Sequence, residues 1–209
     1  MYCFHPAGGA ASLYRGWSAK CPAGFATAAL QLPGRETRMR ETPHRSMQAA
    51  VAEIVDALEE MPSGPFCFFG FSLGGLVALA TVRELRRRGR PLPSRLIVAA
   101  SPSPLGERKP VSEMSDEAVI EEIRLSGTVP EFILREREVM RTMLPTIRAD
   151  LELLESFRSE EEASPLPVPI VAYGSLSDPL VEPAEIASWS SATSSNFRMR
   201  FFPGNHYFL

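Results

Sequence analysis

The chain has 209 residues, of which 44% are hydrophobic and 22% are charged, and its formal net charge is -3. This composition is typical of a folded globular protein and excludes a chain that is disordered or repetitive throughout. Its slight acidity argues against a nucleic-acid-binding protein, because such proteins neutralise phosphates with an excess of Lys and Arg. We therefore expect a folded protein without a nucleic-acid partner.

The first residues and the cysteines indicate where the protein resides. No basic region followed by a long apolar stretch stands at the N-terminus, so we expect no secretory signal. Cys3, Cys21 and Cys67 are odd in number and lack the spacing of metal ligands. They therefore predict reduced thiols in a cytoplasmic protein.

Six short apolar runs predict β-strands, at residues 2–4, 28–32, 66–69, 96–100, 168–173 and 197–202. Most of these runs are nearly continuous in apolar character, which is typical of parallel strands covered on both faces. The last run alternates between apolar residues and arginines, which indicates a strand nearer the edge of the sheet.

Helical patterns lie between these runs. Apolar residues recur at helical spacing over residues 51–58, and Ser46 suits the N-cap of this helix. A second helix is predicted over residues 76–88, where an arginine-rich tail suits the C-terminus. The apolar stretch 65–82 then contains a buried strand and a buried helix, so we expect no membrane partner. Alternating strands and helices predict an α/β fold, with a mostly parallel central sheet flanked by helices.

Residues 107–165 differ from the rest of the chain. Up to Glu162 this segment has 15 acidic and 8 basic residues, so the remainder of the chain has a net positive charge. Ser115 and the two acidic residues behind it predict a helix start, and Pro145 suits the first position of another helix. We interpret the segment as a helical lid over an active site, and a solvated helical excursion is the alternative.

The sequence GFSLG at residues 70–74 has the G-x-S-x-G pattern of a nucleophile elbow. That turn requires a strand before it and a helix after it, and the sequence predicts both. The two glycines leave room for a tight turn that lifts the Ser72 hydroxyl out of the sheet. We therefore predict Ser72 as a nucleophile, with a glycine-rich turn and a capping serine as the alternative.

A serine nucleophile needs a base and an orienting acid, which in this type of fold follow it in the order acid, then His. Of the three histidines, only His206 follows Ser72, and it lies in a turn beyond the last predicted strand. Asp178 follows the strand predicted at residues 168–173. Loops at the carboxyl ends of parallel strands build such sites, so we predict His206 as the base and Asp178 as the acid. Weaker candidates for the acid are Asp116, Asp150 and Glu182.

The oxyanion of an acyl-transfer intermediate needs two backbone N–H donors. One donor is expected at Leu73, directly after the nucleophile, and the other on a loop after an early strand. Paired glycines after the first predicted strand allow a close backbone approach there, which makes Ala7 the second candidate. We expect His5 to shape this loop and not to act as a base.

Five motifs in chain order resemble those of type II thioesterases, which accompany nonribosomal peptide and polyketide synthases. CFHPAGGAASLYRGW, from residue 3, resembles the opening motif, and LPGRETR, from residue 32, matches the LPGRExR signature. GFSLGG, from residue 70, matches the GHSMGG elbow. LPTIRAD, from residue 144, resembles the LPxLRAD stretch of the lid, and PGNHYFL, from residue 203, resembles PGGHFFL. The resemblance covers nearly the whole chain.

The resemblance implies an α/β-hydrolase fold with a helical lid insertion. Residues 1–106 are then the first part of the core, 107–165 the lid and 166–209 the second part of the core. The resemblance also implies Ser72, Asp178 and His206 as a catalytic triad, with Ala7 and Leu73 as oxyanion donors. In this chain Phe71 and Leu73 replace the usual His and Met of the elbow, which we expect to alter the acyl pocket. We expect Phe132, Leu134, Met140 and Leu144 of the lid to determine the depth of that pocket.

The substrate that the resemblance implies is an acyl or aminoacyl thioester on the phosphopantetheine arm of a carrier protein. Hydrolysis would clear stalled or misprimed carriers in polyketide or nonribosomal peptide biosynthesis, with no cofactor of its own. The partner is then an acyl or peptidyl carrier domain, and the enzyme is expected to be a monomer. Such carriers are typically acidic, so Arg83, Arg86 and Arg87 are candidates for docking, although a soluble helix end is the alternative.

Two other functions remain open. A general carboxylic-ester or acyl-CoA hydrolase without a carrier partner would use the same catalytic residues. A non-catalytic binding protein on a hydrolase scaffold would have no need to keep a nucleophile, a base and an acid together.

Overall fold

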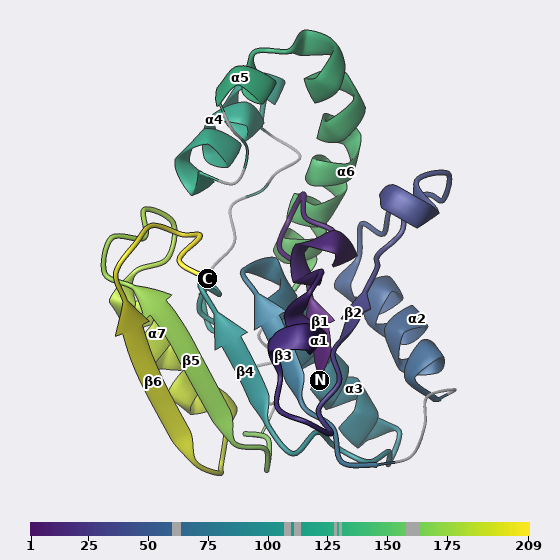
Figure 1. Ribbon diagram of the computed structural model, residues 1–209, viewed down its shortest axis with the longest axis vertical. Helices are drawn as coiled ribbons and strands as arrows, with labels where there is room; N and C mark the ends of the chain where they lie inside the picture. Colours follow the sequence, from purple (N-terminus) through teal and green to yellow (C-terminus); the bar gives the residue numbers. More distant parts are fainter. Residues whose placement is uncertain (60–63, 107–109, 111–113, 128, 130, 158–163) are drawn as a thin grey trace.

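In the computed structural model, the described residues are 1–59, 64–106, 110, 114–127, 129, 131–157 and 164–209. Six strands form one parallel sheet in the order β2-β1-β3-β4-β5-β6 (Figure 1). Their bounds are β1 Tyr2–Phe4, β2 Ala28–Leu30, β3 Phe68–Phe71, β4 Leu96–Ala99, β5 Ile170–Ser175 and β6 Phe197–Phe202. The predicted α/β class is therefore confirmed, and β6 lies at an edge as its alternating sequence indicates.

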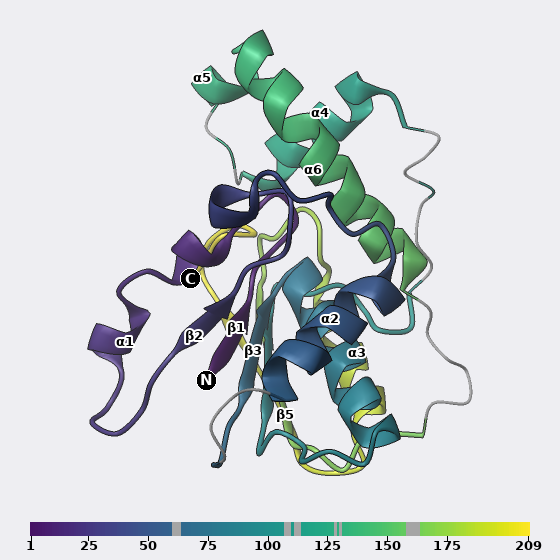
Figure 2. The same ribbon diagram turned by 90° about the vertical axis from the view of Figure 1, so that its right-hand side faces the viewer.

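Helices cover the sheet unequally. On one face lie α2 (Met47–Glu59), α3 (Leu73–Arg87) and the short α7 (Pro183–Ser188) (Figures 1 and 2). The opposite face carries the segment after β1, with the 3₁₀ helix η1 (Ala11–Tyr14) and α1 (Trp17–Lys20) (Figure 2). Two further 3₁₀ turns, η2 (Glu36–Arg38) and η4 (Trp189–Ala192), complete the connections.

Between β4 and β5 the chain leaves the sheet and forms α4 (Asp116–Ser126), α5 (Glu131–Leu134) and α6 (Arg137–Ser156). These helices, here called the lid helices, stand beyond the carboxyl ends of the strands (Figure 1). Ser115 is the N-cap of α4, since its hydroxyl accepts a hydrogen bond from the Ala118 N–H at 3.2 Å, as predicted. The predicted boundary at residue 107 lies outside the described residues, so the domain limits stay a prediction.

The predicted helix start at Pro145 is wrong, because Pro145 lies inside α6. A proline inside a helix has no N–H for the carbonyl four residues earlier and opposes the helix. Helix α6 continues through it because side chains on both sides of Pro145 are buried. Met140 and Leu144 pack among the lid helices, while Leu153 lies in the main core.

In the part of the chain that the structure describes, no helix combines the length and apolar character that crossing a bilayer requires.

Candidate active site

Ser72 occupies the sharp turn between β3 and α3, with φ 54 and ψ -121. The turn is possible because of the glycines around it. A Cβ on Gly70 would lie 2.3 Å from the Gly74 carbonyl oxygen, and a Cβ on Gly74 would lie 2.2 Å from the Phe4 carbonyl oxygen. Helix α3 therefore packs directly against β1 and β3 and begins immediately after Ser72.

A chain of hydrogen bonds joins Ser72, His206 and Asp178. His206 Nε2 lies 3.1 Å from Ser72 Oγ, and His206 Nδ1 lies 2.8 Å from Asp178 Oδ2. The other carboxylate oxygen of Asp178 accepts the backbone N–H groups of Leu180, at 2.9 Å, and Val181, at 3.2 Å. These bonds fix the carboxylate, and both His206 and Asp178 are almost fully buried. The structure thus brings together three residues that are predicted from three separate segments.

The weaker candidates for the acid lie elsewhere. Asp116 binds Arg148 on the lid helices, and Glu182 forms a capping box at the start of α7. Asp150 is buried but is paired with Arg35. Of the other histidines, His44 pairs with Glu53, while His5 hydrogen-bonds the Pro6 carbonyl through Nδ1 at 2.9 Å.

Ala7 and Leu73 line the same pocket as Ser72 and His206. Among the described residues, neither backbone N–H of this pair has a hydrogen-bond partner. Leu73 is the first residue of α3, where N–H groups are unpaired within a helix and the helix dipole favours negative charge. Both N–H groups are therefore free to bind an oxyanion beside Ser72.

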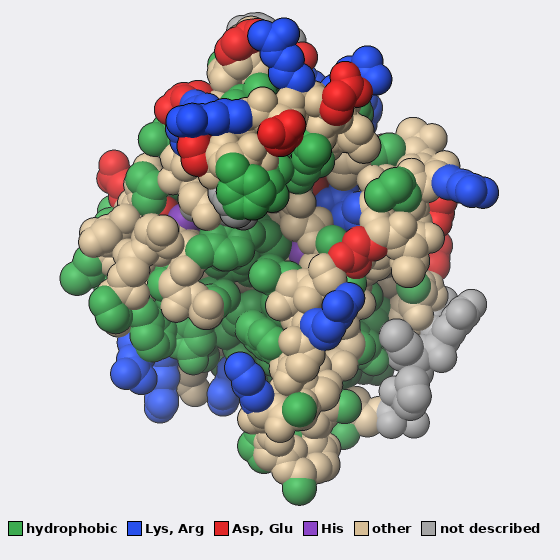
Figure 3. All heavy atoms as spheres, turned by 45° about the horizontal axis from the view of Figure 1, so that its top comes forward, with side chains coloured by type: hydrophobic (Ala, Val, Ile, Leu, Met, Phe, Trp, Pro, Cys, Tyr) green, Lys and Arg blue, Asp and Glu red, His purple; other side chains and the backbone are tan. Residues whose placement is uncertain are grey.

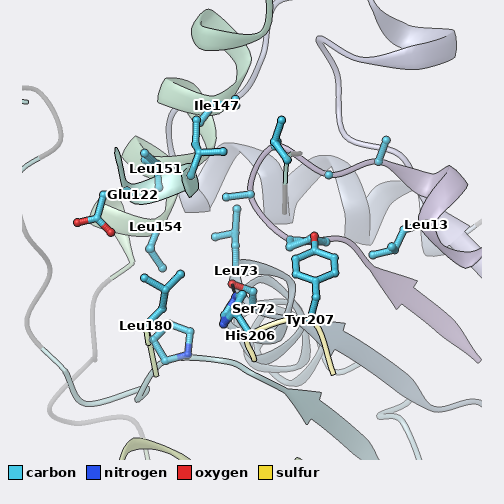
Figure 4. Close-up of a pocket in the computed structure, with 18 of the residues that line it drawn as sticks. Leu13, Ser72, Leu73, Glu122, Ile147, Leu151, Leu154, Leu180, His206 and Tyr207 are labelled. Carbon is cyan, nitrogen blue, oxygen red and sulfur yellow. Dashed lines mark hydrogen bonds between the residues drawn. The ribbon is translucent and has the colours of Figure 1, made fainter. Parts of the chain in front are cut away.

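The pocket above Ser72 has a volume of about 490 Å³. Figure 4 shows Leu180 beside His206, Tyr207 on the other side of Ser72, and Ile147, Leu151 and Leu154 descending from α6. Figure 3 shows hydrophobic side chains gathered below the lid helices, whereas charged side chains gather on the outer surface of the lid. The lining is mainly apolar, which suits an acyl chain.

The lid residues that were expected to set the depth of the pocket do not line it. Phe132 is 70% exposed, and Leu134, Met140 and Leu144 are buried among the lid helices themselves. Helical spacing identifies an apolar stripe but not which part of it faces a cavity, and here the cavity meets Ile147, Leu151 and Leu154.

The two substituted elbow positions differ in their surroundings. Leu73 lines the pocket. Phe71 does not, since it is buried beside the pocket with its ring 5.6 Å from the His206 ring and 4.7 Å from the Tyr207 ring. Phe71 therefore packs against the ring of His206, the candidate catalytic histidine, from outside the pocket.

The candidate docking arginines lie far from this pocket, near the C-terminal end of α3. Ser72 is at the N-cap position of α3, so the arginines lie about 20 Å from it along the helix axis. Arg87 pairs with Glu84 at 2.7 Å, and Arg86 donates to the Ser164 hydroxyl at 3.1 Å. The Arg83 guanidinium lies over the Phe157 ring at 5.6 Å. Docking at these arginines stays a prediction.

One buried ion pair, formed by Arg35 and Asp150, was not predicted from the sequence. A signal for it existed, since Asp150 stands three residues after Ile147 and one before Leu151. It is thus a charged residue on the apolar side of its helix.

No cluster of three or more His, Cys, Asp or Glu side chains that could hold a metal ion occurs in the described ranges.

Comparison with known proteins gives concordant matches. The chain is 30% identical to the gramicidin S biosynthesis protein GrsT of Aneurinibacillus migulanus, over 100% of this chain and 82% of that protein. It is 33% identical to thioesterase PikA5 of Streptomyces venezuelae, over 100% of this chain and 75% of that protein. Among solved structures, RedJ, a thioesterase from the prodiginine pathway of Streptomyces coelicolor, matches with a TM-score of 0.91 and 34% identity, over 99% of this chain and 78% of RedJ.

The thioesterase domain family model matches residues 1–209. With the fold and the relatives in agreement, the chain belongs to the thioesterase domain family, whose type II members its motifs resemble.

Proposed function

We propose that this protein is a serine thioesterase that hydrolyses acyl or aminoacyl thioesters from the phosphopantetheine arm of carrier proteins. The observation that carries the proposal is the hydrogen-bonded chain from Ser72 through His206 to Asp178, which opens into a mainly apolar pocket. The relatives support the proposal, since GrsT is named a gramicidin S biosynthesis protein, PikA5 a thioesterase, and RedJ a thioesterase from the prodiginine biosynthetic pathway.

In the first half of the reaction, Ser72 Oγ attacks the thioester carbonyl carbon while His206 Nε2 takes the hydroxyl proton. Asp178 holds His206 in the tautomer that accepts this proton and stabilises the imidazolium. The N–H groups of Ala7 and Leu73 donate to the oxyanion. The carbon–sulfur bond then breaks, and the pantetheine thiol leaves with the proton from His206.

In the second half, water replaces the thiol. His206 takes a proton from this water, which attacks the acyl group on Ser72 and forms a second oxyanion. The intermediate collapses to the free acid, and His206 returns the proton to Ser72. Each step uses side chains and backbone of this chain, so the proposed chemistry needs no metal or other cofactor.

We also propose that the protein is cytoplasmic, because carrier domains and their synthases are expected in that compartment. The three cysteines, which are free thiols in the structure, are consistent with a reducing compartment.

The proposal is tested by thiol release from an acyl-loaded carrier protein. Wild type should release thiol, whereas Ser72→Ala should lose at least about 10³-fold of the rate, because the nucleophile is absent. Ser191→Ala removes an exposed hydroxyl on η4, away from the pocket, and should behave like wild type. The acid should appear in an amount equal to the thiol.

A second assay separates the alternatives. The same acyl group is presented on the carrier, as a small soluble thioester and as an oxygen ester. Equal kcat/KM on the carrier-bound and the small thioester would contradict the proposal that the enzyme recognises a carrier protein. Preference for the oxygen ester would indicate a general esterase. No turnover of any substrate by folded wild type would indicate a binding protein.

A further inference from the structure

A buried ion pair joins segments that lie far apart in the sequence. Asp150 belongs to α6, and Arg35 belongs to the loop after β2. Both terminal nitrogens of Arg35 lie 2.7 Å from the carboxylate oxygens of Asp150. The side chains are 8% and 1% exposed, so the pair lies inside the protein.

The remaining contacts of this pair reach the loop that carries Ala7. The Gly8 N–H donates to Asp150 Oδ2 at 2.8 Å. Arg35 Nη1 donates to the Gly9 carbonyl at 3.0 Å. Asp150 therefore holds Gly8 as an acceptor and Arg35 holds Gly9 as a donor, and the two side chains also bind each other.

The loop has little rigidity of its own. It contains two consecutive glycines, and Gly8 has φ +68, a conformation that suits glycine. Its internal supports both end on the Pro6 carbonyl, which accepts from the Gly9 N–H at 3.0 Å and lies 2.9 Å from His5 Nδ1. Neither bond involves the Ala7 N–H. The direction of the Ala7 N–H consequently depends on groups outside the loop.

Stability is a weak explanation for such a pair. Removing two charges from water costs about as much as their attraction returns, and apolar replacements are often as stable. Holding the loop in position is a better explanation. The Asp150 carboxylate accepts the Gly8 N–H, and Arg35 neutralises its charge, so that the carboxylate does not repel an oxyanion bound nearby. Arg35 thus orients the loop and balances the charge of Asp150.

We propose that Arg35 and Asp150 are positioning residues that set the Ala7 N–H for oxyanion binding and make this geometry depend on helix α6. The inference rests on the oxyanion donors proposed above. Neither side chain lines the pocket, so both act through the loop and not on the substrate.

The test compares Asp150→Asn with a control on the same helix. Glu152→Gln removes another ion pair between α6 and the core, since Glu152 binds Arg45 at 2.5 Å, but it has no contact with the oxyanion loop. Active sites are titrated in each variant, and rates are measured below the unfolding temperature. Arg35→Lys keeps the charge but loses the planar fork, and it provides the same readout if Asp150→Asn does not fold.

Three quantities are measured with a small soluble thioester, so the carrier does not enter. In Asp150→Asn we expect kcat to fall 10- to 100-fold, on the order of a misplaced oxyanion donor, with KM nearly unchanged. Affinity for an alkyl trifluoromethyl ketone, which adds to Ser72 and places an oxyanion in the hole, should fall by a similar factor. Affinity for the product acid and all values for Glu152→Gln should stay near wild type.

Two results would overturn the inference. One is a lower Tm for Asp150→Asn and Arg35→Lys with unchanged kcat and ketone affinity per active site, which is the mark of a purely structural pair. The other is an equal loss of kcat in Glu152→Gln, which would assign the effect to helix tethering in general. If wild type neither hydrolyses thioesters nor binds the ketone at Ser72, the proposed function itself fails.

Discussion

The backbone of Ser72 is held by β4 and by the segment directly after it. Its N–H donates to the Ala99 carbonyl at 2.8 Å, and its carbonyl accepts from Ser101 Oγ, also at 2.8 Å. A positive φ at a residue with a side chain costs on the order of 1–3 kcal/mol and persists only where its surroundings enforce it. These two bonds, with the glycines that permit close packing, keep the hydroxyl directed into the pocket.

His5 gives the stability of the protein a dependence on pH. Burial lowers the pKa of His5 below its ordinary value of 6.5, while nearby Asp150 raises this pKa and Arg35 lowers it by smaller amounts. Because the pKa of His5 is lowered in the folded state, the unfolded chain binds more protons than the folded chain as the pH falls toward and below about 6.5. We expect the free energy of unfolding to decrease from pH 7.5 to 5.5, with a His5 contribution of up to about 1.4 kcal/mol per pH unit.

Urea unfolding at several pH values checks this expectation, with His5→Gln as the comparison. The variant is expected to be less stable at every pH, but the difference from wild type should shrink as the solution becomes more acidic. A difference that stays constant with pH would show that His5 does not titrate on unfolding.

The residues of the candidate site differ in how far the sequence could predict them. Ser72, Asp178 and His206 each follow a predicted strand in a set order, so a local pattern identifies them. Arg35 and Asp150 could not be paired in this way, because their contact depends on how α6 crosses the loop after β2. Arg35 lies in the motif LPGRETR and Asp150 in the motif LPTIRAD, and Asp150 was also an alternative acid, but neither motif indicates that the two residues pair.

Helix α6 has different neighbours along its length. Its first half packs with α4 and α5, its middle lines the pocket, and its last turns lie in the main core. Thr146 near its middle donates to the Gly34 carbonyl at 3.0 Å, and Ser156 at its end accepts from the Met47 N–H at 2.7 Å. The second half is therefore fixed to the core, and its side chains form a stable wall of the pocket.

Leu154→Phe should shorten the acyl chain that the pocket accepts. Leu154 lines the pocket, and a larger ring there fills part of its volume. We expect kcat/KM to fall about 10-fold or more for a long acyl thioester and to stay close to wild type for an acetyl thioester. Phe132→Ala is the matched control, because Phe132 is 70% exposed and does not line the pocket. A change of chain-length preference in Phe132→Ala alone would contradict this assignment.

The sequence predicted which strands and helices exist better than it predicted the residues at which they begin and end. The third strand was expected at residues 66–69 but is β3, Phe68–Phe71, because Gly70 pairs with Phe4 on one side and Val98 on the other. Glycine is rare in strands, so local preference ended the run too early. The partner strands that override this preference lie more than 20 residues away in the sequence.

Two hydrophobic clusters make up most of the interior beneath and above the pocket. The larger one includes β3, β4, β5 and the buried faces of α2 and α3, and the smaller one joins the three lid helices. Leu153 belongs to the larger cluster, and Leu144 belongs to the smaller one. The large core and the small helical core above it are thus connected through α6, and a third cluster that includes Tyr14, Phe69 and Phe71 lies apart from both.

This organisation predicts unequal local stability. The smaller cluster buries less apolar surface, so α4 should open with a lower free energy than α3, whose side chains are mostly fully buried. Hydrogen exchange followed by mass spectrometry should show α4 amides exchanging faster than those of α3 and β4, with the second half of α6 close to the core. Equal protection of α4 and α3 would indicate one cooperative unit.

Pro145 divides α6 near the level where the pocket begins. The carbonyl of Arg141 lacks its usual helical donor, so the helix can bend there at low cost. The α6 residues that line the pocket, Ile147, Leu151 and Leu154, all follow Pro145, and so does Asp150. The same stretch of helix therefore forms an apolar wall of the pocket and carries the carboxylate that holds the oxyanion loop. A substitution that shifts this stretch should change acyl-chain preference and turnover together, whereas the α6 residues before Pro145 contact neither the pocket nor the loop.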